Sequence, residues 1–191
     1  MESSAPWVGS RGTLVNMCGR QPQAAPGRNG ACVMIDNLFF TLILLSALGC
    51  GLMAGVFFIF SNTVMNALAR LRPPDGIAAM QSINRTILNP LFFAAFFGTA
   101  ATSILLAVSL LWRWQQPGAG YLLSGSLLYL IGVMLVTIVF NVPMNESLDT
   151  VEPESVEAAN LWAGYLRNWT AWNHVRTAAA FLGALMFILA L

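Results

Sequence analysis

Hydrophobic residues dominate four separate stretches of the chain, and most of them are long enough to cross a lipid bilayer. The stretches are residues 38–60, 91–112, 121–140 and, shorter than the others, 175–191. A membrane-spanning helix needs about 20 mainly apolar residues, and a segment in lipid is helical because its backbone groups must hydrogen-bond internally. The pattern therefore predicts an all-α membrane protein with four transmembrane helices in an up-and-down bundle.

The first and third loops between these stretches also carry helical patterns. After Pro73-Pro74-Asp75, apolar residues recur at helical spacing as far as Ile87, which predicts a short helix at the membrane surface. Asn89-Pro90 then supplies a cap and a first-turn proline for the second span. In the third loop, a second short interfacial helix is expected to begin at Pro153.

Four aromatic residues step by three or four positions through the third-loop helix and so share one face of it. They are Trp162, Tyr165, Trp169 and Trp172. The favoured interpretation is a belt of amphipathic rings at the membrane interface. The alternative is a flat wall on which a polycyclic aromatic ligand could stack.

Small residues recur at four-residue spacing in three of the predicted spans. The pairs and triplets are Gly51 with Gly55, Ala94 with Gly98 and Thr102, and Ala179 with Gly183. Such positions allow close approach of membrane helices. We expect them to form contacts within the bundle.

Polar residues concentrate at one end of the predicted bundle, because successive spans alternate in direction. The residues at this end are Asn62, Asn66, Asn84, Arg85, Asn89, Asn141, Asn145, Asn173, His174 and Arg176, whereas the opposite end has only Arg113, Gln115 and Gln116. Helix caps would be needed equally at both ends. The asymmetry therefore places any active or binding site at the polar end.

Composition excludes several classes of protein. Hydrophobic residues make up 57% of the chain and charged residues 9%, and the net charge is +1 without a single lysine. This is unlike the basic surface of a nucleic-acid-binding protein. With one histidine, three cysteines in no C-x-x-C pair, and no carboxylate within a span, neither a di-iron site nor a bis-histidine haem can form.

The first 33 residues differ in composition from the rest and show no apolar period, which predicts a disordered tail before a membrane domain at 34–191. Met34 is an alternative initiator, with the upstream stretch a misannotated start. From Met34 onward, five arginines lie at the polar end against Arg113 at the other, which favours a cytoplasmic polar end. With the tail included, the bias nearly vanishes.

Four segments resemble the anthrone-oxygenase-like family of small four-helix membrane proteins, many of them bacterial proteins of unknown function. The segments are residues 51–58, 79–85 followed by Asn89-Pro90, 140–145 and 169–177. The resemblance runs from about Met34 to the C-terminus. It implies a multi-pass protein of the bacterial inner membrane that oxidises an anthrone to an anthraquinone with O2 and without a cofactor.

Under this resemblance, the partners are membrane lipid, a hydrophobic aromatic molecule and O2, and the residues at the polar end take specific roles. His174 is the base that deprotonates the acidic ring carbon, and Arg176 or Arg85 stabilises the resulting anion. The substrate is oriented by Asn84, Asn89, Asn141, Asn145, Asn173, Trp169 and Trp172. Individually, the same residues could be caps or snorkelling side chains.

A non-catalytic function is the alternative, as a membrane subunit, a lipid-binding protein or an assembly factor, and the oligomeric state is open. Uptake of O2 in the presence of an anthrone separates enzyme from non-enzyme.

An even number of spans predicts that both termini lie on the side opposite the polar end. In a chain without its native cysteines, Ser10→Cys and Ser147→Cys should be labelled from opposite sides of sealed vesicles by an impermeant maleimide. Equal labelling of both positions from one side would contradict this topology.

Overall fold

The computed structural model describes residues 26–191, with side chains at residue 30 and from Val33 onward. Residues 38–191 form one compact unit, and the packing described below lies within it. The first helix begins at Pro26, so residues 26–33, predicted to belong to a disordered tail, are helical. The rest of that predicted tail, including Ser10, lies outside the described residues.

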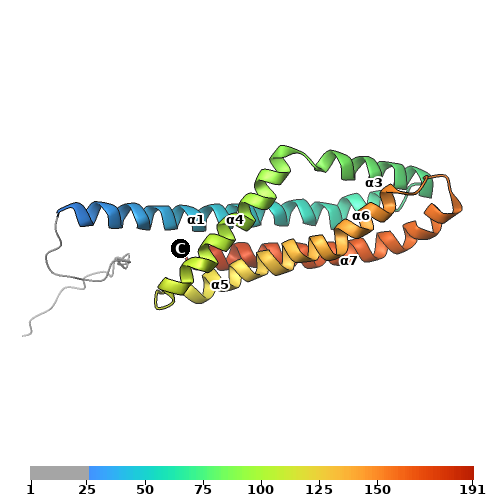
Figure 1. Ribbon diagram of the computed structural model, residues 1–191. Coiled ribbons are helices and arrows are strands. Elements are labelled where there is room, and N and C mark those ends of the chain that lie inside the picture. The colour runs from blue at the N-terminus through green and yellow to red at the C-terminus, as the bar shows by residue number, and fades with distance from the viewer. Residues whose placement is uncertain (1–25) are drawn as a thin grey trace, which may run out of the picture. The chain divides into compact units, whose positions relative to one another are not determined.

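Every regular element in the described range is a helix (Figure 1). In chain order the elements are α1 (Pro26–Ile59), η1 (Phe60–Val64), α2 (Met65–Leu68), α3 (Pro73–Ile87), α4 (Pro90–Arg113), α5 (Ala119–Leu127), η2 (Leu128–Leu135), η3 (Thr137–Asn141), α6 (Val142–Asp149) and α7 (Val156–Leu189). α1 continues directly into the π-helical segment η1, and α5 into η2.

Four helices in the described chain are long and apolar enough to cross a membrane, which agrees with the number predicted. They are Val33–Leu68, Pro90–Arg113, Ala119–Asp149 and Val156–Leu189. Between 28% and 39% of the most apolar window of each is buried in the protein. The remaining apolar surface faces outward, which a soluble monomer rarely tolerates and a bilayer accommodates.

The helix of the first loop is present as α3, and α4 begins as its sequence predicts. Arg72 precedes α3 and forms an exposed ion pair with Asp75 at 2.8 Å, and this hydrogen bond lowers the pKa of the Asp75 carboxyl. The Oδ1 atom of Asn89 accepts a hydrogen bond from the Phe92 backbone N–H at 3.0 Å and so caps α4.

The predicted third-loop helix is not a separate element. It forms the first half of α7, which runs without interruption for 34 residues into the fourth span. The third span likewise continues past Asn141, the predicted end, to Asp149. At the two predicted boundaries, Asn141 and Asn173 are buried in the bundle and donate to the carbonyls of Trp169 and Phe57, so both helices continue through them.

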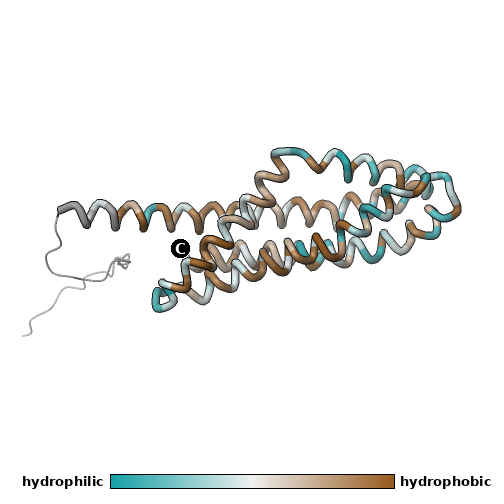
Figure 2. Tube along the Cα trace, viewed as in Figure 1, coloured by the Kyte–Doolittle hydropathy of each residue, from teal (hydrophilic) through white to brown (hydrophobic). Residues whose placement is uncertain are grey.

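The aromatic face of α7 is buried, which corrects the favoured interpretation of an interfacial belt. Trp162, Tyr165 and Trp169 are each less than 5% exposed and pack with residues of α2, α3 and α6. Figure 2 shows hydrophilic residues gathered on α3, α6 and the first half of α7. These apolar rings therefore form the core of the polar end, because α3 covers them from water.

The long helices contact one another at a few specific positions. Ser46 of α1 donates a hydrogen bond to Thr102 of α4 at 2.8 Å, and the Tyr129 hydroxyl of η2 donates to the Phe96 carbonyl of α4 at 2.9 Å. α4, the helix from α5 through α6, and α7 reverse direction in turn (Figure 1).

Three of the glycines predicted to form close helix contacts do not form them, and two other glycines do. Gly51, Gly55 and Gly98 have open space where a Cβ would lie, so the prediction that they pack within the bundle is wrong. A Cβ at Gly132 would instead collide with Ala179 of α7, and one at Gly49 with Thr99 of α4. Spacing alone could not identify which small residues face inward.

Substituting Gly132 by alanine should destabilise the fold by about 1–3 kcal/mol, because the added methyl group overpacks the contact with Ala179. Reversible unfolding in mixed micelles measures this change. Gly51→Ala is the matched control, since nothing lies within 4 Å of its added Cβ. Equal stability of the two variants would contradict the close approach.

Candidate functional site

One arginine side chain, Arg176, is buried in the interior of the α7 span. It is 5% exposed, and its guanidinium carbon lies 4.4 Å from the ring centroid of Phe57 and 5.3 Å from that of Trp169. Its Nη1 donates to the Thr137 hydroxyl at 3.3 Å, and its Nη2 donates to Oδ1 of Asn173. The cation is thus held between two aromatic faces by neutral oxygens.

Asn173 connects this arginine to α1. It is fully buried, and its Nδ2 donates to the Phe57 carbonyl and to the Ser61 hydroxyl, both at 2.6 Å. Ser61 lies in η1, where the α1 helix changes to π-helical geometry. Wide turns of this kind are frequent at functional sites. Asn173 and Arg176 are three residues apart and therefore share one face of α7.

A second asparagine, Asn145 of α6, organises the aromatic residues next to Arg176. Its Oδ1 accepts hydrogen bonds from the Tyr165 hydroxyl and from Nε1 of Trp169, both at 2.8 Å. One turn earlier, the Nδ2 of buried Asn141 donates to the Trp169 carbonyl at 3.3 Å. The third and fourth spans are thereby joined by side-chain amides.

Two polar atoms in this region are buried and have no hydrogen-bond partner, namely Nε of Arg176 and Oδ1 of Asn141. The side chain of Asn84 lies next to the Tyr165 hydroxyl. Buried polar groups are almost always paired, so the two unpaired atoms make the region a candidate site for a polar ligand. We call the whole arrangement the Arg176 centre, which consists of Phe57, Ser61, Asn84, Thr137, Asn141, Asn145, Tyr165, Trp169, Asn173 and Arg176.

The charge of Arg176 has no carboxylate partner among the described residues. Arg72 with Asp75 and Arg85 with Asp149 form ion pairs that lie on the exposed surface. An arginine within a span costs about 3 kcal/mol on insertion scales and faces a bundle interior or a cavity. The Arg176 centre therefore carries a positive charge suited to an anionic ligand.

Three of the predicted site residues have structural surroundings away from this centre. Arg85 of α3 forms its exposed ion pair with Asp149 of α6 at 2.7 Å. Asn89 caps α4. Trp172 stacks on Phe140, with ring centroids 3.6 Å apart. Of the predicted set, Asn84, Asn141, Asn145, Trp169, Asn173 and Arg176 are the residues that the fold brings together.

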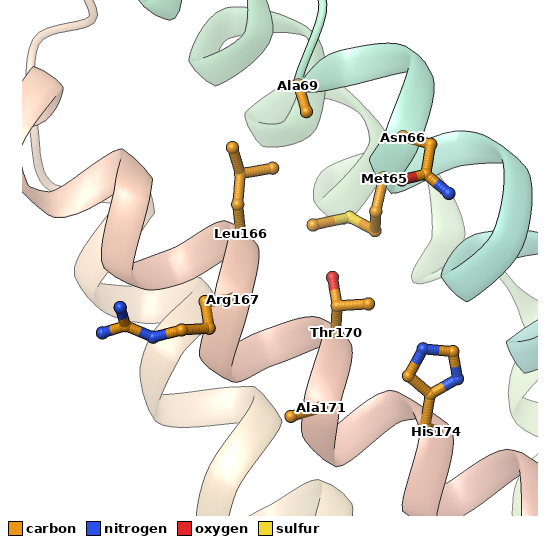
Figure 3. A pocket seen from close by; sticks show the side chains of 8 residues that line it. All are labelled: Met65, Asn66, Ala69, Leu166, Arg167, Thr170, Ala171 and His174. Carbon is orange, nitrogen blue, oxygen red and sulfur yellow. The ribbon is translucent and has the colours of Figure 1, made fainter.

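His174 lies on a different side of α7 from Arg176 and is exposed. It lines a surface groove of about 280 Å³ between α2 and α7, together with Met65, Asn66, Ala69, Leu166, Arg167, Thr170 and Ala171. In Figure 3 the imidazole and Thr170 face this groove, whereas the guanidinium of Arg167 points away from it. The Thr170 hydroxyl is buried without a hydrogen-bond partner.

Several residues of the Arg176 centre were not predicted as site residues. Ser61 and Thr137 lie near the ends of their spans, and Tyr165 belongs to the predicted aromatic face. The sequence signal that could have identified Ser61 and Thr137 is a hydroxyl-bearing residue within or next to an apolar stretch. Within residues 26–191, no three His, Cys, Asp or Glu side chains converge as a group able to hold a metal ion.

The fold and the site define an α-helical membrane protein with a buried cationic centre between its third and fourth spans. Residues 91–186 match the family model described as anthrone oxygenase, and the chain belongs to this family. The matched region includes α4 and ends within α7, so it contains both asparagines of α6 and η3 together with Asn173 and Arg176. Comparison with curated proteins and with solved structures finds no match.

Replacing Asn145 by alanine should destabilise the fold by about 1–3 kcal/mol, because the Tyr165 hydroxyl and Trp169 Nε1 lose their shared acceptor. Chemical unfolding in mixed micelles measures the difference. Asn160→Ala removes an exposed amide from α7 and should be nearly neutral. A neutral effect at Asn145 would show that these hydrogen bonds contribute nothing to stability.

Proposed function

We propose that this protein oxidises a flat, polycyclic aromatic carbon acid of the anthrone class with O2, without a metal or a flavin. The observation that carries this proposal is the buried guanidinium of Arg176, which lies beside aromatic rings and neutral amides, has no carboxylate partner among the described residues and has an Nε–H without a hydrogen-bond partner. Family membership supports the substrate class. The site supports the chemistry, because it offers what the anion of such a substrate requires.

The reaction needs stabilisation of negative charge more than it needs a redox cofactor. Loss of a proton from the ring CH2 group of an anthrone to solvent gives a carbanion whose charge is delocalised onto the carbonyl oxygen. The carbanion reduces O2 and forms a carbon–oxygen bond, and the peroxide anion takes a proton back from solvent. Loss of water from the resulting hydroperoxide leaves the second quinone carbonyl. A preorganised cation in a dry site favours the first of these steps.

Residues of the Arg176 centre take distinct roles in this proposal. The Nε–H of Arg176 donates to the substrate oxyanion, and Oδ1 of Asn141 accepts from a substrate hydroxyl. Asn84, next to the Tyr165 hydroxyl, lies at the edge of this site. Trp169 and Tyr165 provide the aromatic wall. A substrate at this centre does not contact His174, which faces the groove on another side of α7.

The membrane setting completes the proposal. Four helices cross the inner membrane of a bacterium up and down, and α3 lies at the surface over the polar end. Its exposed arginine, Arg85, suits contact with lipid head groups. A hydrophobic substrate then reaches the protein by partitioning into the bilayer, which also concentrates O2.

The groove that contains His174 is a second candidate for the site of reaction. Its volume of about 280 Å³ is close to the lower end of ligand pockets, roughly 300–1,000 Å³. The groove offers an accessible imidazole and the unpartnered Thr170 hydroxyl. There His174 would be the general base, as the sequence predicts, and Arg176 would have a structural role.

Substitution of the two cationic candidates separates these sites. In nanodiscs supplied with an anthrone such as emodin anthrone, Arg176→Gln should lower the rate of O2 uptake by roughly 10²- to 10³-fold, the usual loss for one oxyanion donor. His174→Asn should retain most of the activity. The opposite result would place the reaction in the groove.

Arg85→Gln is the matched control for Arg176→Gln, because it removes an exposed arginine and should leave O2 uptake nearly unchanged. Circular dichroism and size-exclusion chromatography verify that each variant is folded. Wild-type protein that consumes no O2 with any anthrone tested would contradict the oxygenase proposal and favour a non-catalytic membrane subunit.

A further inference from the structure

Asn173 has no spare donor with which to bind a substrate. Both hydrogens of its Nδ2 are engaged, one by the Phe57 carbonyl and the other by the Ser61 hydroxyl. Its Oδ1 accepts from Nη2 of Arg176. The side chain is fully buried. A role in direct substrate recognition, predicted from the sequence, is therefore less suitable than a role in holding Arg176.

We propose that Asn173 is a positioning residue that fixes Arg176 with a neutral oxygen and so reserves the full positive charge of the guanidinium for the substrate anion. This inference rests on the proposed function. The role of Asn173 is then electrostatic, because the residue must orient the cation without neutralising it. An aspartate has nearly the same shape and could accept the same hydrogen bond, but it would cancel the charge.

The surroundings of Arg176 are neutral on every packed side. α1 and η1 contribute Phe57 and Ser61, and η3 contributes Thr137 and Asn141. α7 itself contributes Trp169, Asn173 and Tyr165, of which Tyr165 is the titratable member. Because none of these side chains is a carboxylate, the charge is uncompensated in this part of the protein. A ligand anion completes the ion pair.

The geometry also gives the tether its rigidity. Asn173 is attached to α1 beside the π-helical segment η1, and Thr137 holds the other nitrogen of the guanidinium from η3. Two helices therefore fix two terminal nitrogens and leave Nε without a partner. The direction of the unpaired N–H is set by the helix packing and not by the arginine rotamer alone.

Ionisation of bound anthrone under anaerobic conditions tests the inference without turnover. The delocalised anion absorbs at longer wavelength than neutral anthrone, so a spectrophotometric pH titration in nanodiscs gives its apparent ionisation constant. Wild-type protein should raise this constant by roughly 10- to 10³-fold over empty nanodiscs, the effect of a nearby opposite charge. Asn173→Asp should abolish most of that increase.

The ionisation of bound anthrone, and not stability, separates the two roles of Asn173. Asn173→Asp should melt below the wild-type temperature in the absence of anthrone, because its carboxylate cannot donate to the Phe57 carbonyl as Nδ2 does, although it pairs with Arg176. A residue with only a structural role would lose stability and leave the ionisation of bound anthrone unchanged. Asn160→Asp is the matched control, since it makes the same substitution at an exposed position of α7 outside the Arg176 centre. This variant should ionise anthrone as wild type does.

Thr137→Asp gives an independent test, because it places a carboxylate on the other held nitrogen while Asn173 is intact. It should also abolish the increase in ionisation, and it carries the test if Asn173→Asp does not fold. Wild-type ionisation of anthrone by either folded aspartate variant would overturn the inference. The inference would also be overturned if wild-type protein left the ionisation constant of anthrone unchanged. If wild-type protein ionised anthrone but consumed no O2, only the oxygenase proposal would be refuted.

Discussion

The contact on which the polar end depends is the hydrogen-bonded burial of Arg176 by Asn173, Thr137 and two aromatic rings. A guanidinium in an apolar helix bundle is costly unless most of its donors are met and its charge is shielded. The surrounding helices supply neutral oxygens and ring faces for this purpose. They supply no carboxylate within the described residues, which leaves a site with positive charge and an Nε–H without a partner.

Two π-helical segments lie beside buried Arg176 and supply polar side chains to its surroundings. π-helical segments occur at Phe60–Val64 in the first span and at Thr137–Asn141 in the third, and each contributes a buried polar side chain to the Arg176 centre. A wide turn changes which side chains face inward. The continuous α7 helix can then present Tyr165, Trp169, Asn173 and Arg176 to these segments along one side, with Asn145 satisfying the two aromatic donors.

One helix separates the two candidate sites. Successive residues of an α-helix are turned by about 100°, so His174 and Arg176, two positions apart, point in widely different directions. Asn173 is on the side of α7 that faces the interior with Arg176, whereas Thr170 is on the side that faces the groove with His174. Asn173-His174-Val175-Arg176, which is a single polar cluster in the sequence, therefore places the guanidinium in the interior and the imidazole on the surface. A single small substrate cannot contact both groups in this arrangement.

The sequence by itself determined the number of spans, the α3 helix, the cap at Asn89 and the end of the molecule where polar residues gather. These depend on local properties, namely the length of apolar runs, helical periodicity and capping chemistry. Only the tertiary structure decided that Trp162 and Trp169 are core residues, that Gly132 rather than Gly51 is a contact, and that Arg176 is buried while Arg85 is paired on the surface. These outcomes depend on which face each helix turns toward its neighbours, and side-chain burial and pairing between distant segments are not encoded in the spacing of any one of them.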